Sequence, residues 1–326
     1  MNAASLAELS NLAVYSATVV YALAFLAHVA EWASARDVTT APARTPQPEP
    51  ALVGGSLGPG IPVASPGGAS RTPDRVELFG RVGVSLSVLG LVIAAVGVLC
   101  RALAAGRVPW GNMYEFAVTG TLAVMAAYLV LVRLYRLRWL GLLVTGFVVV
   151  VLGAAVLTLY VPAGPLVPAL HSYWLVIHVA AAAVAGGGFT VGAAASVLYL
   201  VKSRAQARAT RGVPARGYLA RLPDAAGIDR VAYRVHAFAF PLWTFAVLCG
   251  AIWAEYAWGR YWGWDPKEVW AFITWVVYAA YLHARATAGW QGRAAAWIAL
   301  AGFTTFLFNF VGINLFGSGL HSYSGL

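Results

Sequence analysis

Six of the 13 tryptophans in the chain fall within residues 253–275, a segment that also contains two glycines and the sequence D-P-K-E. They are Trp253, Trp258, Trp262, Trp264, Trp270 and Trp275. An aromatic belt at the membrane surface explains some of the tryptophans, which gather at such surfaces. The start of a helix explains Asp265, Pro266 and Glu268, which suit its N-cap, N1 and N3 positions. A belt needs only one or two indoles, so the cluster favours an aromatic platform for a large planar apolar ligand.

Histidines supply the second kind of chemistry. His178 is expected about one helical turn into an apolar helix and His321 after the last one, both at the end of the molecule that carries the tryptophans, with His171 nearby. Two neutral imidazoles on opposite faces of a ring suit a six-coordinate haem iron, and no carboxylate cluster accompanies them as a hard-ion site would require. The sequence therefore predicts a haem site beside the tryptophans.

Three other histidines lie away from this site. His283 follows Glu268 by fifteen residues, about 22 Å along a helix, so it belongs to a deeper level of the membrane. There it is either a ligand of a second haem or a buried, hydrogen-bonded residue. His28 has Glu31 three residues later and is expected to form a helical pair, whereas His236 is predicted to be interfacial.

Other reactive groups are sparse. Arg260 and Lys267 flank the tryptophans and would pair with haem propionates or anchor lipid headgroups. Cys100 and Cys249 form no C-x-x-C motif and are expected to be packing residues. The chain has no P-loop or H-E-x-x-H sequence, so no motif supports a nucleotide-driven transporter or a zinc protease.

The elements that position these residues are expected to be membrane helices. The chain has 326 residues, of which 60% are hydrophobic and 10% charged, with a mean hydropathy of +0.73. We predict an all-α polytopic membrane protein with about eight spans. The spans are approximately Asn11 to Ala33, Leu78 to Leu99, Met113 to Val132, Trp139 to Tyr160, Trp174 to Val201, Val235 to Ala257, Glu268 to Ala284 and Ala294 to Phe316.

Basic residues set the expected orientation. With both termini outside, eighteen of the 22 Lys and Arg residues fall on the cytoplasmic side, and the net charge of +10 is a topology signal rather than a sign of nucleic-acid binding.

A first helix (1–33) precedes a Pro- and Gly-rich linker (34–77), predicted to be disordered and cytoplasmic. The membrane domain (78–326) carries the external tryptophan-rich loop (253–275) and a basic cytoplasmic loop (202–234), where at most a short helix is expected. The glycines of 186–192 are expected to pack helices closely.

Four segments carry a family resemblance. The sequence W-G-R-Y-W-G-W-D-P-K-E-V-W-A-F-I-T-W resembles the tryptophan-rich (WWD) signature of system II cytochrome c biogenesis proteins of the CcsA/ResC type. The segment N-F-V-G-I-N-L-F-G-S-G-L-H-S-Y, the residues around His178, and W-G-N-M-Y-E-F from Trp110 to Phe116 also resemble that family. The resemblance covers most of the chain from Leu78 onward.

The resemblance implies a haem-handling subunit of a haem lyase, the holocytochrome c synthase. It implies that haem b, as a transferred substrate, is conveyed across the plasma membrane and held on its outer face with His178 and His321 as iron ligands. His283 would ligate an inner haem together with a histidine of a ResB/Ccs1-type partner. The other residues implied in haem binding are Trp258, Arg260, Trp262, Trp264, Asp265, Lys267 and Trp270.

Further partners follow from the same resemblance. They are an apocytochrome c with a C-x-x-C-H segment (CXXCH), a thiol-reducing system and the lipid bilayer. Two other functions stay open at this point: a haem-b electron-transfer membrane cytochrome, or a transporter without a cofactor.

Overall fold

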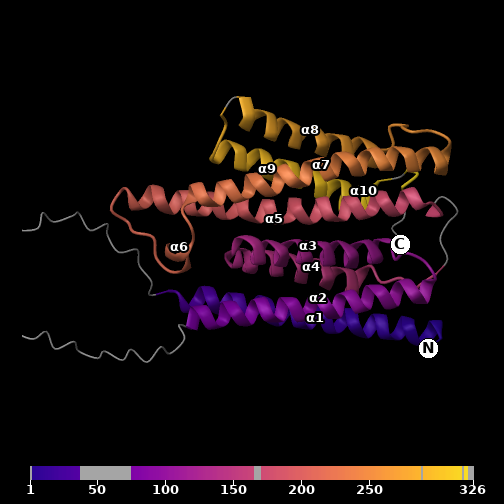
Figure 1. Ribbon diagram of the computed structural model, residues 1–326, viewed down its shortest axis with the longest axis horizontal. Helices are drawn as coiled ribbons and strands as arrows, with labels where there is room; N and C mark the ends of the chain where they lie inside the picture. Colours follow the sequence, from indigo (N-terminus) through magenta and orange to yellow (C-terminus); the bar gives the residue numbers. More distant parts are fainter. Residues whose placement is uncertain (1, 37–74, 165–169, 288, 318, 322–326) are drawn as a thin grey trace, which may run out of the picture.

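The computed structural model describes residues 2–36, 75–164, 170–287, 289–317 and 319–321, and within them the chain is helical without a β-strand element (Figure 1). Long helices run side by side along the molecule, as expected for a polytopic membrane protein. The helices are α1 (Ala3–Ser34), α2 (Arg75–Ala105), α3 (Met113–Tyr135), η1 (Arg138–Leu140), α4 (Gly141–Thr158), α5 (Tyr173–Ala209), α6 (Tyr218–Arg221), α7 (Ala225–Trp258), α8 (Pro266–Thr287), α9 (Arg293–Leu307), η3 (Phe308–Gly312) and α10 (Ile313–Phe316).

Each of the eight predicted spans corresponds to a helix or a run of consecutive helices. Within the described residues, seven of these are long and apolar enough to cross a membrane. The predicted span at 268–284 is α8, which has 22 residues but is less apolar because tryptophan, tyrosine, histidine and arginine interrupt its hydrophobic residues. Figure 1 shows α8 running alongside α7 and α9. A pair of hydrogen bonds from Arg285 to Asp229, 2.8 and 2.9 Å long, also joins α8 to α7.

The linker and the basic loop differ from the predicted bounds. Residues 37–74, most of the predicted linker, lie outside the described residues, and α1 and α2 extend over its two edges. Most of the predicted loop at 202–234 is helical, because α5 continues to Ala209 and α7 begins at Ala225. The one-turn helix α6 lies between them, which agrees with the short helix expected there. Hydropathy marks only the apolar part of a helix, so it misses these basic extensions.

Glycines of α5 allow its neighbours to approach closely. A Cβ atom at Gly187 would lie 2.9 Å from the backbone oxygen of Ala123 in α3, and one at Gly188 would lie 2.8 Å from Ala239 in α7. A Cβ at Gly192 would lie 2.5 Å from the imidazole of His236. The glycine-rich segment therefore packs helices on more than one side of α5, in agreement with its predicted role.

Alanine at position 187 is expected to destabilise the fold by about 1–3 kcal/mol, because the new methyl group would press on backbone that has no side-chain rotamer to change. Gly153, which lies in α4 with open space around it, provides the matched control. Gly153→Ala is expected to be neutral or stabilising, since alanine favours helix more than glycine does. Thermal unfolding in detergent measures both variants, and equal unfolding temperatures would contradict the packing role.

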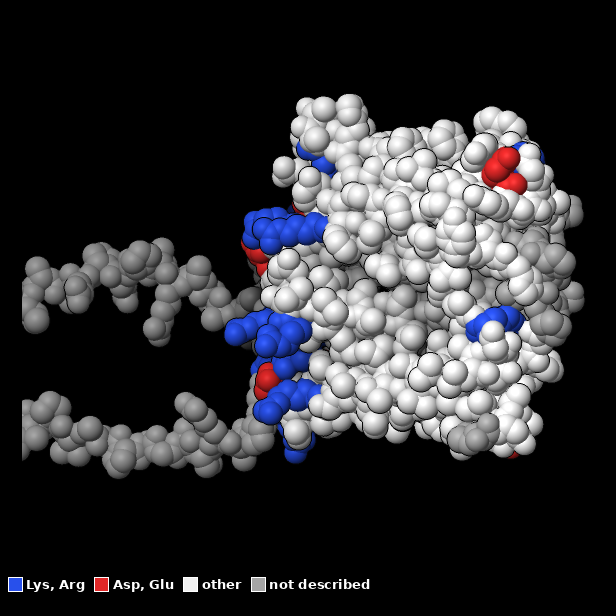
Figure 2. All heavy atoms as spheres, turned by 45° about the vertical axis from the view of Figure 1, so that its right-hand side comes forward, with Lys and Arg blue, Asp and Glu red and all other residues white. Residues whose placement is uncertain are grey.

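The two ends of the bundle differ in charge. Figure 2 shows Lys and Arg side chains concentrated at one end of the molecule, the end at which α6 lies in Figure 1. The first residues of α1 and the last described residues after α10 lie at the opposite end (Figure 1). We refer to the first as the basic end. The second, where the segment between α7 and α8 also lies, is called the tryptophan end.

Candidate functional site

The tryptophan-rich loop connects α7 to α8 and is held by Glu268. The helix α7 ends where Gly259 adopts a left-handed conformation with φ 70°. The Glu268 carboxylate accepts hydrogen bonds from the backbone N–H groups of Gly263, at 2.8 Å, and Asp265, at 3.1 Å. It also forms an ion pair with Arg260 at 3.0 Å. This is the capping arrangement predicted for the start of α8, and it fixes the path of the loop.

Asp265 ties this loop to the C-terminal segment. Its carboxylate accepts hydrogen bonds from the Lys267 backbone N–H at 3.1 Å, the Leu320 backbone N–H at 2.8 Å and His321 Nδ1 at 2.8 Å. Burial favours the neutral acid, but the hydrogen bond and charge of His321 and the two backbone N–H groups outweigh it and lower the pKa of Asp265 to about 2. Asp265 is therefore an anion that orients His321.

A low pH is expected to abolish the stabilisation that Asp265 provides. Because its folded-state pKa lies below the ordinary value, this stabilisation is present above the ordinary pKa and is lost as the pH falls toward 2. The difference in unfolding temperature between the wild type and Asp265→Asn is expected to shrink between about pH 5 and about pH 2. A difference that stays unchanged at the lowest pH would contradict the assignment.

His178 and His321 contact the same indole, that of Trp253. The His178 ring lies 6.0 Å from the Trp253 ring at an interplanar angle of 15°, and the His321 ring lies 5.5 Å from it at 69°. His178 comes from α5 and Trp253 from α7, whereas His321 follows α10. The structure thus brings the two predicted iron ligands to one place.

Each imidazole is held in place through its Nδ1 atom, which leaves Nε2 as the nitrogen that could bind a metal. Nδ1 of His178 lies 2.7 Å from the carbonyl oxygen of Ala246, and Nδ1 of His321 lies 2.8 Å from the Asp265 carboxylate. These oxygens only accept hydrogen bonds, so in each neutral ring Nδ1 carries the proton and Nε2 carries the lone pair. Histidines that bind a metal typically donate their other ring N–H to a carbonyl or carboxylate oxygen in this way.

The tryptophans do not form a single platform. Trp258 contacts His321 edge-on at 4.7 Å and Trp253 at 4.8 Å, so it belongs to the histidine site. Trp262 and Trp264 form a separate edge-on pair at 5.9 Å, and Trp264 is 70% exposed. Trp270 packs against Phe308 of η3 at 4.2 Å. The predicted aromatic platform is therefore divided into a part at the histidines, an exposed part and a part that packs helices.

Arg260 and Lys267, the two residues predicted to pair with haem propionates, contact residues close to them in the sequence. The Arg260 guanidinium pairs with Glu268 and lies 5.8 Å from the centre of the Trp258 ring. Lys267 is half-buried, and its backbone N–H donates to Asp265. Their role toward haem stays a prediction.

The remaining histidines are not part of this site. His283 is exposed on α8, and His171 is exposed at the tryptophan end. His28 is buried and its Nδ1 lies 2.8 Å from Glu31, which is the predicted helical pair. The prediction for His236 is wrong: it is fully buried and packs against Phe189, because α7 begins eleven residues before it.

Two features of the site were not predicted from the sequence. Trp110 and Trp174 pack against the cluster that contains Trp253, and each indole Nε1 is buried with no hydrogen-bond partner in the described part of the chain. Buried Glu115 accepts hydrogen bonds from Arg101 at 2.9 Å and Arg107 at 2.8 Å. The family-like segments W-G-N-M-Y-E-F and L-H-S-Y-W contain three of these five residues, so they were the available signal.

Metal ligation by protein groups alone has no support here. Over the described residues, no group of three or more His, Cys, Asp or Glu side chains is placed to hold a metal ion. Cys100 and Cys249 are buried and unpaired, in agreement with the packing role predicted for them.

Comparison with known proteins identifies the family. Residues 110–321 match the family model described as cytochrome C assembly protein. The cytochrome c biogenesis protein CcsA of Gloeothece citriformis is 35% identical over 302 residues, which are 79% of this chain and 90% of that protein. CcsA of Synechocystis sp. is 35% identical over 289 residues, covering 73% of this chain and 86% of the relative.

A solved structure shares the fold. The cytochrome c haem lyase CcmF matches with a TM-score of 0.62 and 18% identity, and the match covers 97% of this chain but 50% of that chain. At this low identity, the match shows that the two chains share a helical fold. This chain belongs to the cytochrome c assembly protein family and is a polytopic membrane protein of the CcsA type.

Proposed function

We propose that this chain is the membrane subunit of a system II cytochrome c synthase that binds haem b at its tryptophan end for attachment to CXXCH apocytochromes c. The observation that carries the proposal is the pair of imidazoles on one indole. His178 and His321 both contact Trp253, and each has its Nδ1 held by a carbonyl or carboxylate oxygen. The lone pairs on Nε2 are then available for the two axial positions of one iron.

The surroundings fit a porphyrin. The site lies against the cluster of Leu175, Val179 and Trp253, with Trp110, Trp174 and Trp258 packed around it. Large aromatic surfaces suit the apolar ring and keep water from the iron. Arg260 lies in the loop between α7 and α8 and Lys267 in the first turn of α8, and both supply cations for the propionates.

The chain acts by positioning rather than by covalent chemistry. The haem vinyl groups and the two cysteine thiols of a CXXCH segment are the reacting groups, and a thiol-reducing system keeps those thiols reduced. The cysteines of this chain are buried in α2 and α7 and are not needed for the reaction. Holding the ring at a fixed angle converts the encounter with the apocytochrome into a reaction between oriented groups.

We infer that haem enters at an inner site near His283 and is conveyed across the membrane to the site at the tryptophan end. His283 is exposed on α8, so its imidazole faces the surroundings of the chain rather than its own core. A histidine from a ResB/Ccs1-type subunit would complete an inner haem site there. In this proposal the basic end faces the cytoplasm and the tryptophan end faces outward from the plasma membrane, as the positive-inside rule favours.

A transfer assay tests the proposed function. The chain is co-purified with its ResB-type partner and mixed with reduced apocytochrome carrying CXXCH, and thioether attachment is read from the shift of the pyridine haemochrome band. We expect covalent haem on the apocytochrome and none when serine replaces the two cysteines. Haem that stays on the membrane complex would indicate an electron-transfer cytochrome, and a complex without haem absorption would indicate a transporter. Either result contradicts the proposal.

A further inference from the structure

A cavity lined by arginines lies at the basic end, away from the histidine site. It has a volume of about 860 Å³ and lies where α1, α2, α3, η1 and α6 meet. Its charged lining consists of Arg81, Arg136, Arg138, Arg221, Glu31 and Glu77. Four cations against two carboxylates give this cavity an excess of positive charge, and nothing in the proposed haem chemistry uses it.

The two carboxylates are already engaged. Arg138 donates two hydrogen bonds to Glu77, at 2.9 and 2.6 Å. Buried Glu31 accepts from the Tyr218 hydroxyl at 2.8 Å and lies 2.8 Å from His28. Arg81 and Arg136 are exposed, and neither forms an ion pair with any described residue. The cavity thus presents two exposed guanidinium groups outside the direct ion pairs of the described residues, although Arg81 also interacts with the charge of Glu77.

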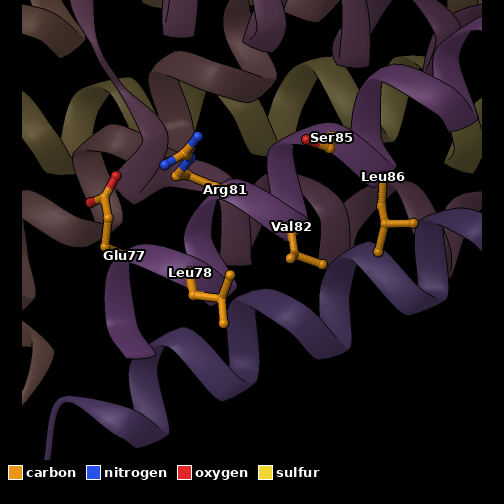
Figure 3. A pocket seen from close by; sticks show the side chains of 6 residues that line it. All are labelled: Glu77, Leu78, Arg81, Val82, Ser85 and Leu86. Carbon is orange, nitrogen blue, oxygen red and sulfur yellow. The ribbon is translucent and has the colours of Figure 1, made fainter. Parts of the chain in front are cut away.

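An apolar groove adjoins the cavity along α2. It has a volume of about 430 Å³ and is lined by two adjacent rows of residues spaced four apart (Figure 3). The polar row is Glu77, Arg81 and Ser85, and the apolar row is Leu78, Val82 and Leu86. The three polar residues also line the arginine cavity, so the two spaces adjoin each other.

We propose that the arginine cavity and this groove together bind one anionic phospholipid, with the phosphate at Arg81 and Arg136 and an acyl chain along Leu78, Val82 and Leu86. The basic end is the predicted cytoplasmic membrane surface, where Arg side chains meet lipid headgroups. Guanidinium groups bind phosphate oxygens, and the leucine and valine side chains match hydrocarbon. A free phosphate would use only the cavity, so the adjoining groove favours a lipid.

Native mass spectrometry of the full chain in detergent tests the proposal without haem. Phosphatidylglycerol is titrated against phosphatidylcholine, and the affinity of the first bound lipid is measured. The double variant Arg81→Gln with Arg136→Gln is expected to weaken phosphatidylglycerol binding about tenfold, since each arginine near a membrane surface contributes to anionic-lipid binding. The control, Arg204→Gln with Arg208→Gln, removes the same charge from α5 at the same end and is expected to change nothing.

Three results would overturn the proposal. Equal weakening in the two double variants, at equal unfolding temperatures, would show that only total charge matters. Displacement of the lipid by glycerol 3-phosphate at similar concentrations would show an anion site that does not use the groove. Displacement by haem would make the cavity a haem site instead. None of these outcomes depends on His178 or His321, so failure here leaves the proposed function untouched.

Discussion

Glycine in place of either His178 or His321 is expected to lower the haem retained by the purified complex about a hundredfold, and added imidazole is expected to restore most of it. Each variant removes one of the two Nε2 atoms available to the iron, while the Ala246 carbonyl or the Asp265 carboxylate that held the ring stays in place. Loss of a group that only hydrogen-bonds to a metal-binding histidine costs about 10- to 100-fold in metal affinity, so loss of the histidine itself is expected at or beyond the upper end of that range. Haem is measured per mole of protein, with the visible spectrum of the reduced state.

His171→Gly is the matched control. This residue is also an imidazole at the tryptophan end, but it is exposed and makes no contact with Trp253 that the structure records. Its haem content and spectrum are expected to equal those of the wild type. Normal haem content in both His178→Gly and His321→Gly would contradict the ligand assignment, and loss in His171→Gly alone would move one ligand to that residue.

Asparagine in place of Asp265 is expected to reduce haem retention about 10- to 100-fold, although both iron ligands remain. The carboxylate accepts from the Leu320 N–H through one oxygen and from His321 Nδ1 and the Lys267 N–H through the other. An asparagine side chain offers one acceptor oxygen, and its NH₂ group would meet a donor at the second position. His321 therefore loses its orientation, or the C-terminal segment detaches from the loop.

The carboxylate at position 255 provides a control for this variant. Glu255 lies in the last turns of α7, near the loop, and its side chain has no hydrogen bond that the structure records. Glu255→Gln removes one negative charge from the same end and is expected to retain haem normally. Equal haem loss in both variants would indicate a general effect of charge, and full retention in Asp265→Asn would show that His321 needs no such partner.

The helical architecture was predictable because it depends on the length of apolar segments, which a sequence shows directly. The N-cap and N3 roles of Asp265 and Glu268 were predictable for a similar reason, since a cap involves residues three apart. His236 was misplaced because hydropathy begins to rise near Val235, whereas the cap of α7 is Asp224. The turns between them are helical, and one face of them, with Ile228, Asp229 and Ala232, is buried in the protein.

The arrangement of the site required the structure. Asp265 and His321 are 56 residues apart, and nothing in either local sequence indicates the hydrogen bond between them. The six clustered tryptophans looked equivalent, yet only Trp253 and Trp258 contact the histidines. Only Trp262 and Trp264 lie between α7 and α8, whereas the other four lie within these two helices, so side chains of one type in one motif acquire different surroundings.

The most direct test of the central claim is the position of iron in the haem-loaded complex with its partner, determined by electron cryo-microscopy. The two imidazoles are expected to bind one iron through Nε2, each at about 2 Å, the usual length of a bond between a metal and an imidazole. Trp253 and Trp258 are expected to border the ring. An outer haem whose iron is bound by neither His178 nor His321, or by only one of them with the second ligand supplied by another residue of this chain, would contradict the account.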